Sequence, residues 1–236
     1  MLDFSKYKYK YDLHVHSLPT SGCADFSPEE VVRIYAEAGF NGIVLTNHMY
    51  GGPHEYETKG KFTDGAYIPA YRRAKAEGEK LGLDVILGIE IRFPESVNDF
   101  LVFGIDEDDV AKAYDYTFSP YEDFYKGFKN ERNLIIQAHP MRQPCEPVPQ
   151  EIVDGYEVFN MHPGHNPRAG LAAQLTYGLK DLYVIGGTDF HHANHQGMCA
   201  LLCKERIKDS FQLAEVIKSK DYILEIWGNK IIPYQY

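Results

Sequence analysis

The sequence predicts an α/β fold in which seven strands form a parallel barrel. Short apolar runs alternate with helical patterns along the chain, which is typical of parallel sheets covered by helices. Five of these runs end in histidine, aspartate or glutamate. Functional groups at nearly every strand end are typical of the carboxyl face of a barrel, whereas an open sheet gathers them at one switch point. The length of 236 residues suits one undivided barrel, so we expect residues 1–236 to form a single domain.

The first strand is expected over 11–16, where the sequence reads YDLHVH. Side chains alternate between the two faces of a strand, so His14 and His16 point the same way and can hold one ion. Imidazole and carboxylate together suit zinc, manganese or iron, and a carboxylate can bridge two ions. Two or three divalent ions are therefore expected at the strand ends. The later runs place similar ligands at His48 (IVLTNH), Glu90 (VILGIE), His139 (LIIQAHP), and Asp189 and His191 (VIGGTDFH).

The other elements follow from capping residues and apolar periodicity. Ser27 with Pro28 predicts the start of a helix, and Gly39 predicts its end. A second helix is expected from Tyr67 to Gly82. Further strands are expected over 42–46, 84–93, 99–105, 134–137, 156–159 and 183–187, with helices over 119–130 and 167–179. A tail adds a strand over 198–203, a helix over 210–219 and a strand over 222–227.

Composition excludes several classes of protein. The formal net charge of -10 argues against sequence-independent binding of nucleic acid, which needs a broad basic surface, although bound ions would reverse the local sign at their site. No apolar run approaches the about 18 residues of a membrane span. The N-terminal stretch lacks the apolar core of a secretory signal, so a cytoplasmic location is expected. The sequence predicts no particular oligomeric state.

The four cysteines form no CxxC pair and are expected to be reduced thiols. Cys199 and Cys203 fall in an apolar run and are interpreted as core residues.

Taken together, the motifs resemble the polymerase and histidinol phosphatase (PHP) superfamily, in the order that the family has them. They are DLHVH at 12–16, TNH at 46–48, GIE at 88–90, AHP at 138–140 and GTDFHH at 187–192. The resemblance implies a distorted barrel of seven β/α units, three metal ions at the strand ends, and phosphoester hydrolysis as the usual chemistry. It implies one ion held by His14, His16 and Asp189, a second held by His139 and bridged to the first by Glu90, and a third held by His48 and His191.

Two departures from the family concern single residues. Asn47 stands where the family usually has aspartate, which removes a carboxylate that would orient a histidine. Many members also have a histidine or aspartate in the first loop as a ligand of the third ion. Here Cys23 and Asp25 are equal candidates for that role.

A third departure concerns the strand over 99–105, which has no histidine for the second ion. The usual position falls at or next to Leu101. Asp99 is expected one strand repeat, roughly 6.6 Å, further from the strand end. We therefore expect a weaker second ion, held by Glu90 and His139 with His162 reaching in.

These residues predict a metal-dependent phosphoesterase that hydrolyses a small phosphorylated substrate with a metal-activated water. Glu90, Asp189 and His191 are the candidate catalytic residues. The alternatives are a metallohydrolase of another bond, such as a cyclic amide, and a catalytically weak regulatory module, against which the seven retained ligands argue. The end of an oligonucleotide is a second substrate class. Arg142, His165 and Arg168 are candidate substrate-binding residues or simple surface residues, and the segment 49–66 is expected to be a long active-site loop.

Overall fold

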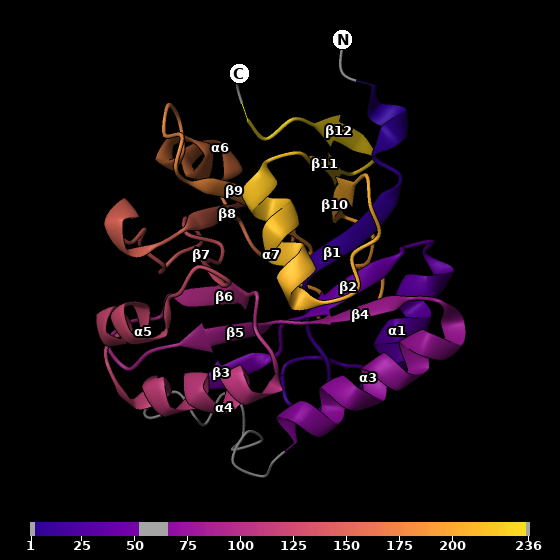
Figure 1. The fold of residues 1–236 in the computed structure, drawn as a ribbon, viewed down its shortest axis with the longest axis horizontal. Helices are drawn as coiled ribbons and strands as arrows, with labels where there is room; N and C mark the ends of the chain where they lie inside the picture. The colour runs from indigo at the N-terminus through magenta and orange to yellow at the C-terminus, as the bar shows by residue number, and fades with distance from the viewer. Residues whose placement is uncertain (1–2, 52–65, 235–236) are drawn as a thin grey trace.

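The computed structural model describes residues 3–51 and 66–234, which form two mixed six-stranded sheets. The first sheet has the order β12-β11-β10-β1-β2-β4, and the second has the order β3-β5-β6-β7-β8-β9 (Figure 1). The first contains β1 (Tyr9–Val15), β2 (Gly42–Leu45), β4 (Asp84–Leu87), β10 (Cys199–Cys203), β11 (Ile223–Ile226) and β12 (Asn229–Ile231). The second contains β3 (His48–Tyr50), β5 (Ile89–Arg92), β6 (Asp99–Phe103), β7 (Leu134–Gln137), β8 (Gly155–Asn160) and β9 (Tyr183–Gly187).

Two chain segments each form a strand in the first sheet, break, and then form a strand in the second sheet. The segment 84–93, expected as one strand, is two strands, because β4 pairs with β2 and β5 pairs with β3. Gly88 lies at this break, where an added Cβ would lie 2.9 Å from Val44 Cγ1, so a larger residue would not fit without movement. The hydroxyl of Tyr67 donates to the carbonyl of Asn47 at 2.7 Å and contacts that of Gly88 at 3.3 Å. The buried Tyr67 side chain thus contacts a carbonyl at the break between β2 and β3 and another at the break between β4 and β5.

The direction of β6 corrects the prediction of an all-parallel array. β6 pairs antiparallel with β5 and with β7, whereas β7, β8 and β9 are parallel to one another. The amino end of β6 therefore lies beside the carboxyl end of β7. The amide of Ala138 donates to the carbonyl of Asp99 at 2.9 Å. The expectation that Asp99 stands back from the strand ends is wrong, because it assumed the opposite strand direction.

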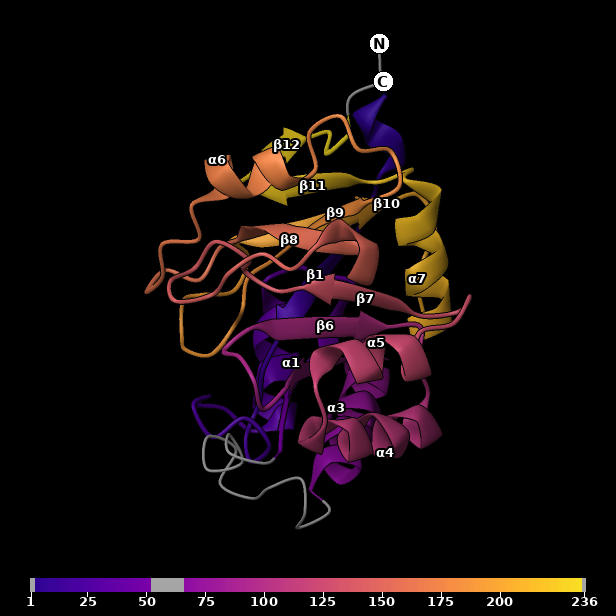
Figure 2. The same ribbon diagram turned by 90° about the vertical axis from the view of Figure 1, so that its left-hand side faces the viewer.

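Helices cover the outer faces of both sheets (Figures 1 and 2). They are α1 (Pro28–Glu37), α3 (Tyr67–Leu81), α4 (Glu107–Asp115), α5 (Tyr121–Phe128) and α6 (Ala169–Ala172), whereas α7 (Ser210–Ser219) lies at one end of the strands. The predicted capping box of α1 is confirmed by mutual hydrogen bonds between Ser27 and Glu30. Gly82 ends α3 with a positive φ of 75°.

Three helical predictions differ from the structure. The sequence reading missed α4, which Asp106 caps. The helix expected over 119–130 is the shorter α5. The helix expected over 167–179 is only the single turn α6 followed by a 3-10 turn over Ala173–Leu175.

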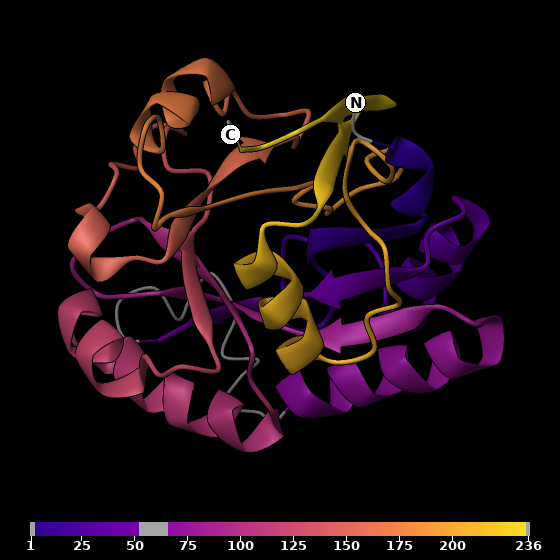
Figure 3. The same ribbon diagram turned by 45° about the horizontal axis from the view of Figure 1, so that its top comes forward.

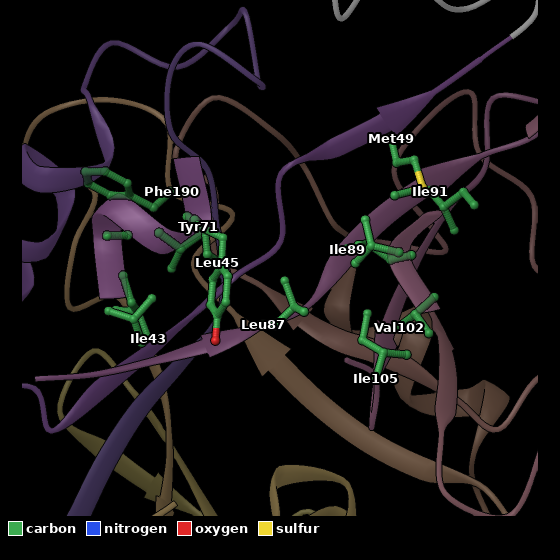
Figure 4. Close-up of a cluster of buried hydrophobic side chains, with 14 of the residues drawn as sticks. Ile43, Leu45, Met49, Tyr71, Leu87, Ile89, Ile91, Val102, Ile105 and Phe190 are labelled. Atoms are coloured by element: carbon green, nitrogen blue, oxygen red, sulfur yellow. The ribbon is translucent and has the colours of Figure 1, made fainter. Parts of the chain in front are cut away.

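The apolar core has an outer and an inner part. The outer part packs α1, α3, α4 and α5 against the sheets, and Figure 4 shows Leu45, Leu87, Ile89 and Val102 within it. The inner part receives side chains from both sheets and from α7, which lies across one end of the strands (Figures 2 and 3). Leu101 belongs to this inner part and is fully buried, as are Cys199 and Cys203, which confirms the core interpretation of both thiols.

The expected loop over 49–66 is only partly described. Its first residues, Met49 and Tyr50, belong to β3, and 52–65 lie outside the described residues. None of the helices in the described ranges is long and apolar enough to span a membrane.

Candidate metal centre

Glu90 stands at the middle of a buried cluster of imidazoles and carboxylates. It comes from β5, directly opposite His48 in the register with β3. Its Oε1 lies 3.3 Å from His14 Nε2 and 3.1 Å from His139 Nε2. Its Oε2 lies 3.4 Å from His16 Nε2 and 2.7 Å from His48 Nδ1. One carboxylate therefore contacts four imidazoles, two from the end of β1, one from β3 and one from the segment after β7.

Asp189 closes the cluster on the side of β1. Its Oδ1 lies 3.4 Å from the Nε2 atoms of both His14 and His16 and 3.4 Å from His191 Nδ1. The backbone of Asp189 has a φ of 56°, and that of His139 has a φ of 31°. Left-handed backbone is uncommon for residues other than glycine and is often found at functional sites. Of the six described residues other than glycine with a positive φ, these two carry donor atoms into the cluster.

Three groups of side chains in the described residues have donor atoms close enough to share an ion. His14, His16 and Glu90 form the first group, and His16, His48 and His191 form the third. The second group is Glu90, Asp99 and His139, in which Asp99 Oδ2 lies 3.6 Å from His139 Nε2. All are buried. The second group contains Asp99, which the sequence pattern excludes as a ligand.

Asp99 is held in place by two arginines. Arg92 binds both carboxylate oxygens at 2.8 and 2.9 Å and is itself buried, with its guanidinium 4.2 Å from the Tyr50 ring centroid. Arg142 Nη2 lies 3.4 Å from Asp99 Oδ2. A bidentate guanidinium fixes the plane of a carboxylate, so Asp99 is preorganised with Oδ2 facing His139.

Two hydrogen-bonded networks that the sequence did not reveal orient the imidazoles. Glu157, buried on β8, places Oε1 at 2.9 Å from His14 Nδ1, and its Oε2 accepts from the amide of His139 at 3.0 Å. Such a carboxylate fixes the tautomer and direction of a ligand histidine. No motif marks Glu157, because it lies inside a strand and not at its end; the only sequence signal is a glutamate in the apolar run GYEVFN.

Asn47 acts on His16 through a serine. Its Oδ1 accepts from the Ser17 amide at 2.7 Å and from Ser21 Oγ at 3.1 Å. Ser21 Oγ lies 3.0 Å from His16 Nδ1. An amide oxygen in this chain therefore does the orienting that a carboxylate would do.

The donor atoms fit divalent ions. His14 Nε2, His16 Nε2, His48 Nδ1 and Glu90 Oε2 are buried and make no hydrogen bond of good geometry, although they face one another. Buried polar atoms are rarely left without partners, because each costs free energy. Mixed nitrogen and oxygen donors that converge in this way are typical ligands of zinc, manganese and iron.

The opposite charges in the cluster shift the pKa values of its members. Burial alone would raise the pKa of Glu90, but His14 and His48 outweigh it and hold the pKa well below its usual range. Burial alone would lower the pKa of His48, yet the charge of Glu90 raises it to about 10. Burial and the charge of Arg142 would lower the pKa of His139, but the hydrogen bonds of its imidazole to Cys145 and Glu90 outweigh them and raise the pKa to about 9. His16 differs, since burial and the nearby His191 and His48 hold its pKa well below the usual value.

The comparison with family models matches the PHP domain over residues 12–227. The chain belongs to the PHP family. The match covers every donor residue described above, from His14 to His191. No curated protein matches the chain.

Solved structures similar to this PHP chain share its fold. A two-domain protein of Bacteroides vulgatus, named as containing a predicted PHP-like metal-dependent phosphoesterase, is 21% identical with a TM-score of 0.66. The match covers 92% of this chain and 64% of that one, so this chain spans less than two thirds of its length. PsfC from Pseudomonas syringae is 14% identical, with a TM-score of 0.64 and coverage of 92% and 91%. An amidohydrolase from Chromobacterium violaceum with bound sulfate and no metal is 14% identical, with a TM-score of 0.53 and coverage of 87% and 96%.

Cys23 and Asp25, the two first-loop candidates of this PHP chain, lie in different surroundings. Cys23 lines the same cavity as His48 and His191. Burial raises the pKa of its thiol, but hydrogen bonds with His191 and His48 outweigh burial and lower it to about 6. Both residues are exposed, but Asp25 pairs with His192, whose Nδ1 lies 2.8 Å from its Oδ2. The geometry favours Cys23 at the third group.

The candidate residues after β7 and β8 gather at the rim of the cavity. His162 stacks on His165 with ring centroids 3.9 Å apart, and it lies outside the Glu90, Asp99 and His139 group. Arg142 Nη1 lies 3.3 Å from His165 Nδ1 and 3.8 Å from Asp189 Oδ2. Arg168 donates to the Met141 carbonyl at 3.4 Å. The expectation that His162 reaches the second group does not fit this arrangement, because Asp99 fills that position.

Proposed function

We propose that this PHP chain is a metal-dependent phosphoesterase that hydrolyses a small phosphorylated molecule. The observation that carries the proposal is the convergence of unpartnered buried donors on Glu90, at the floor of a cavity of about 260 Å3. Arg92 and Arg142 also line this cavity. Cations beside an acidic metal centre suit an anionic substrate, and Arg142 can bind phosphate oxygens through two parallel hydrogen bonds.

The ligand sets that we propose follow the three donor groups. His14, His16 and Asp189 would hold the first ion, and Glu90 would bridge it to the second. Asp99 and His139 would complete the second set, and His48, His191 and Cys23 would form the third. Asp99 thus takes the place of the histidine that many family members have on this strand.

When bound, divalent ions supply Lewis-acid stabilisation of the phosphoryl oxygens and acidify the attacking water. The side chains of this chain do the positioning. Glu157 and Ser21 fix the imidazoles of His14 and His16, and Arg142 is placed to orient the phosphate. Glu90, Asp189 and His191 are the proposed catalytic residues, because each carries a donor atom into the reacting centre.

We infer that the two sheets act together as one distorted barrel of the PHP type. β1 and the segment after β9 exchange hydrogen bonds, from the His16 amide to the Phe190 carbonyl at 3.0 Å and from the Phe190 amide to the His14 carbonyl at 3.1 Å. The shared inner core supports the same inference.

A screen of metal-loaded protein tests the function. We expect more than one equivalent of zinc, manganese or iron by elemental analysis, and phosphate release from a set of small phosphomonoesters. Glu90→Gln should abolish release while the circular dichroism spectrum stays unchanged. Glu122→Gln is the matched control, since this exposed glutamate pairs with Lys126 on α5.

The same screen contains the alternatives. Cyclic amides test the chemistry named for the Chromobacterium violaceum amidohydrolase, and oligonucleotide ends test the second class of phosphoester. Hydrolysis of cyclic amides without phosphate release would contradict the proposal. Bound metal without turnover of any substrate would favour the regulatory module.

A further inference from the structure

A second cavity opens beside the metal centre. Its volume is about 420 Å3, and it shares Arg142 and His165 with the cavity over the donor cluster. Its size is within the range of small-molecule sites. The lining residues are Arg142, Gln143, Pro144, Gly164, His165, Asn166 and Arg168.

Arg168 is unusual among the arginines of this acidic protein. It makes no ion pair with any described carboxylate, and its recorded side-chain partner is the Met141 carbonyl at 3.4 Å. The other seven arginines each have a carboxylate oxygen within 4.0 Å in the described part of the chain: Arg33, Arg72, Arg73, Arg92, Arg132, Arg142 and Arg206. The net charge is -10, so an uncompensated guanidinium facing a cavity is not part of a general basic surface.

Arg142 forms the wall between the two cavities. Its side chain is 21% exposed and lies between Asp99 and Asp189 on one side and His165 on the other. The second cavity therefore has a guanidinium on its inner wall and another, that of Arg168, elsewhere in its lining. Gln143 and Asn166 add amide groups, and no carboxylate is among the described lining residues. This lining is complementary to an anion.

We infer that this second cavity binds a further anionic group of the substrate, so that the preferred substrates are phosphoesters whose alcohol portion itself carries a phosphate or carboxylate. The inference rests on the proposed phosphoesterase function and names its substrate class. The scissile phosphate would occupy the metal centre. The second anion would be held by Arg168 together with the outer face of Arg142.

Matched substrates test the inference. Propyl phosphate has no second anion, 3-(phosphonooxy)propanoate adds a carboxylate, and propane-1,3-diol bisphosphate adds a phosphate; longer alkanediol bisphosphates vary the reach. We expect kcat/KM of the wild type to be at least about tenfold higher for the best doubly anionic ester than for the matched alkyl phosphate, as one charge-assisted hydrogen bond allows. The carboxylate and bisphosphate arms show which anion is preferred.

Variants at Arg168 test the residue. Arg168→Met keeps the aliphatic length and removes the charge, so the preference ratio should fall about tenfold, and Arg168→Lys should restore part of it. Arg72→Met is the control, because this exposed arginine pairs with Glu107 on the helical side of the fold and should keep the wild-type ratio. A ratio that is unchanged in Arg168→Met, or a wild type that prefers the alkyl phosphate, would overturn the inference.

A binding measurement separates this inference from the proposed function. Propane-1,3-bisphosphonate cannot be hydrolysed, and its affinity for metal-loaded protein is measured by calorimetry. About tenfold weaker binding to Arg168→Met than to the wild type supports the second site even if no ester is turned over, in which case only the phosphoesterase proposal fails. Equal binding to both proteins refutes the second site, whatever the activity.

Discussion

Asp99 illustrates how strand direction decides what a single side chain can do. In a parallel strand, Asp99 would lie one strand repeat further from the strand end than the metal ligands, which would exclude it as a ligand. In the antiparallel β6 the same residue lies beside His139, with Oδ2 3.6 Å from its Nε2. Strand direction depends on a connection that the local sequence does not encode, so the residues of the strand alone cannot place Asp99.

The first prediction concerns the ion count at Asp99. Asp99→Asn removes a charged ligand from the second group and is expected to lower the number of bound ions by one. His162→Ala is expected to leave the number unchanged, because His162 lies at the rim. Elemental analysis after equilibrium dialysis measures both. A loss of one ion in His162→Ala with none in Asp99→Asn would restore the assignment made from sequence.

The second prediction distinguishes the two first-loop candidates. Cobalt(II) bound by a thiolate gives a sulfur-to-metal charge-transfer band, and thiolate ligands also favour zinc over harder ions. Cobalt-substituted wild type should show this band, and Cys23→Ser should lose it. Asp25→Asn is the control and should keep it. A band that survives in Cys23→Ser would exclude Cys23 as the ligand.

At the scale of elements, the sequence was informative wherever a pattern is local. The capping box of α1, the glycine that ends α3, and the strand ends that carry His14, His48, Glu90, His139 and Asp189 all follow from neighbours in the chain. The breaks between β2 and β3 and between β4 and β5 do not, because they are set by a change of pairing partner. Glu157 was missed for the same reason: its role is set by β1 and β7 beside it.

Strand β9 supports the third prediction. Gly187 ends β9, and an added Cβ would lie 2.5 Å from His14 Cβ and 2.8 Å from Glu157 Oε1. Gly187→Ala should therefore displace the His14 side chain and weaken metal binding by roughly 10- to 100-fold, as other changes around metal ligands do. Metal competition with a chromogenic chelator measures this.

Gly170→Ala is the control for that measurement, because a Cβ at Gly170 meets nothing within 4 Å. It should leave metal affinity unchanged. Wild-type affinity in Gly187→Ala would mean that the contact between β9 and β1 is not needed to hold His14.

At the scale of the whole molecule, metal removal should destabilise the fold. The donors come from both sheets, so bound ions stabilise only the folded chain. Free metal at 1,000 times its Kd stabilises by about 4 kcal/mol per site. For a chain of this size that corresponds to a loss of about 10 °C in Tm after chelation. Differential scanning calorimetry with and without chelator measures it, and a single transition is expected if residues 1–236 fold as one domain. An unchanged Tm would contradict a metal centre shared by the two sheets.

The last prediction concerns pH. His48 and His139 have pKa values of about 10 and about 9 in the metal-free protein, so both are protonated at pH 7. Ligand imidazoles must be neutral, so metal affinity should rise between pH 6 and 9 with release of protons.

Both pKa values are raised above the unfolded value, so the contribution of these two histidines to stability is complete below about pH 6.5 and is lost as the pH rises through 9 to 10. Metal-free protein should therefore become less stable toward pH 10 while its metal affinity grows. Denaturant titrations and calorimetry at two pH values measure the two trends, and parallel trends would contradict this account.

The position of β1 affects the order in which parts of the fold can form while the chain is being synthesised. β1 pairs with β2, about thirty residues further along the chain, and with β10, which follows it by about 190 residues. His14 on β1 and His16 directly after it also need Asp189 to complete their contacts. Long-range pairings of this kind form slowly, because the entropy cost of closing a large loop comes before the strands gain any stabilising contact. On the ribosome, the first of these metal-binding strands to emerge is therefore among the last to be enclosed, and ions can be captured in full only after Asp189 and β10 have been synthesised.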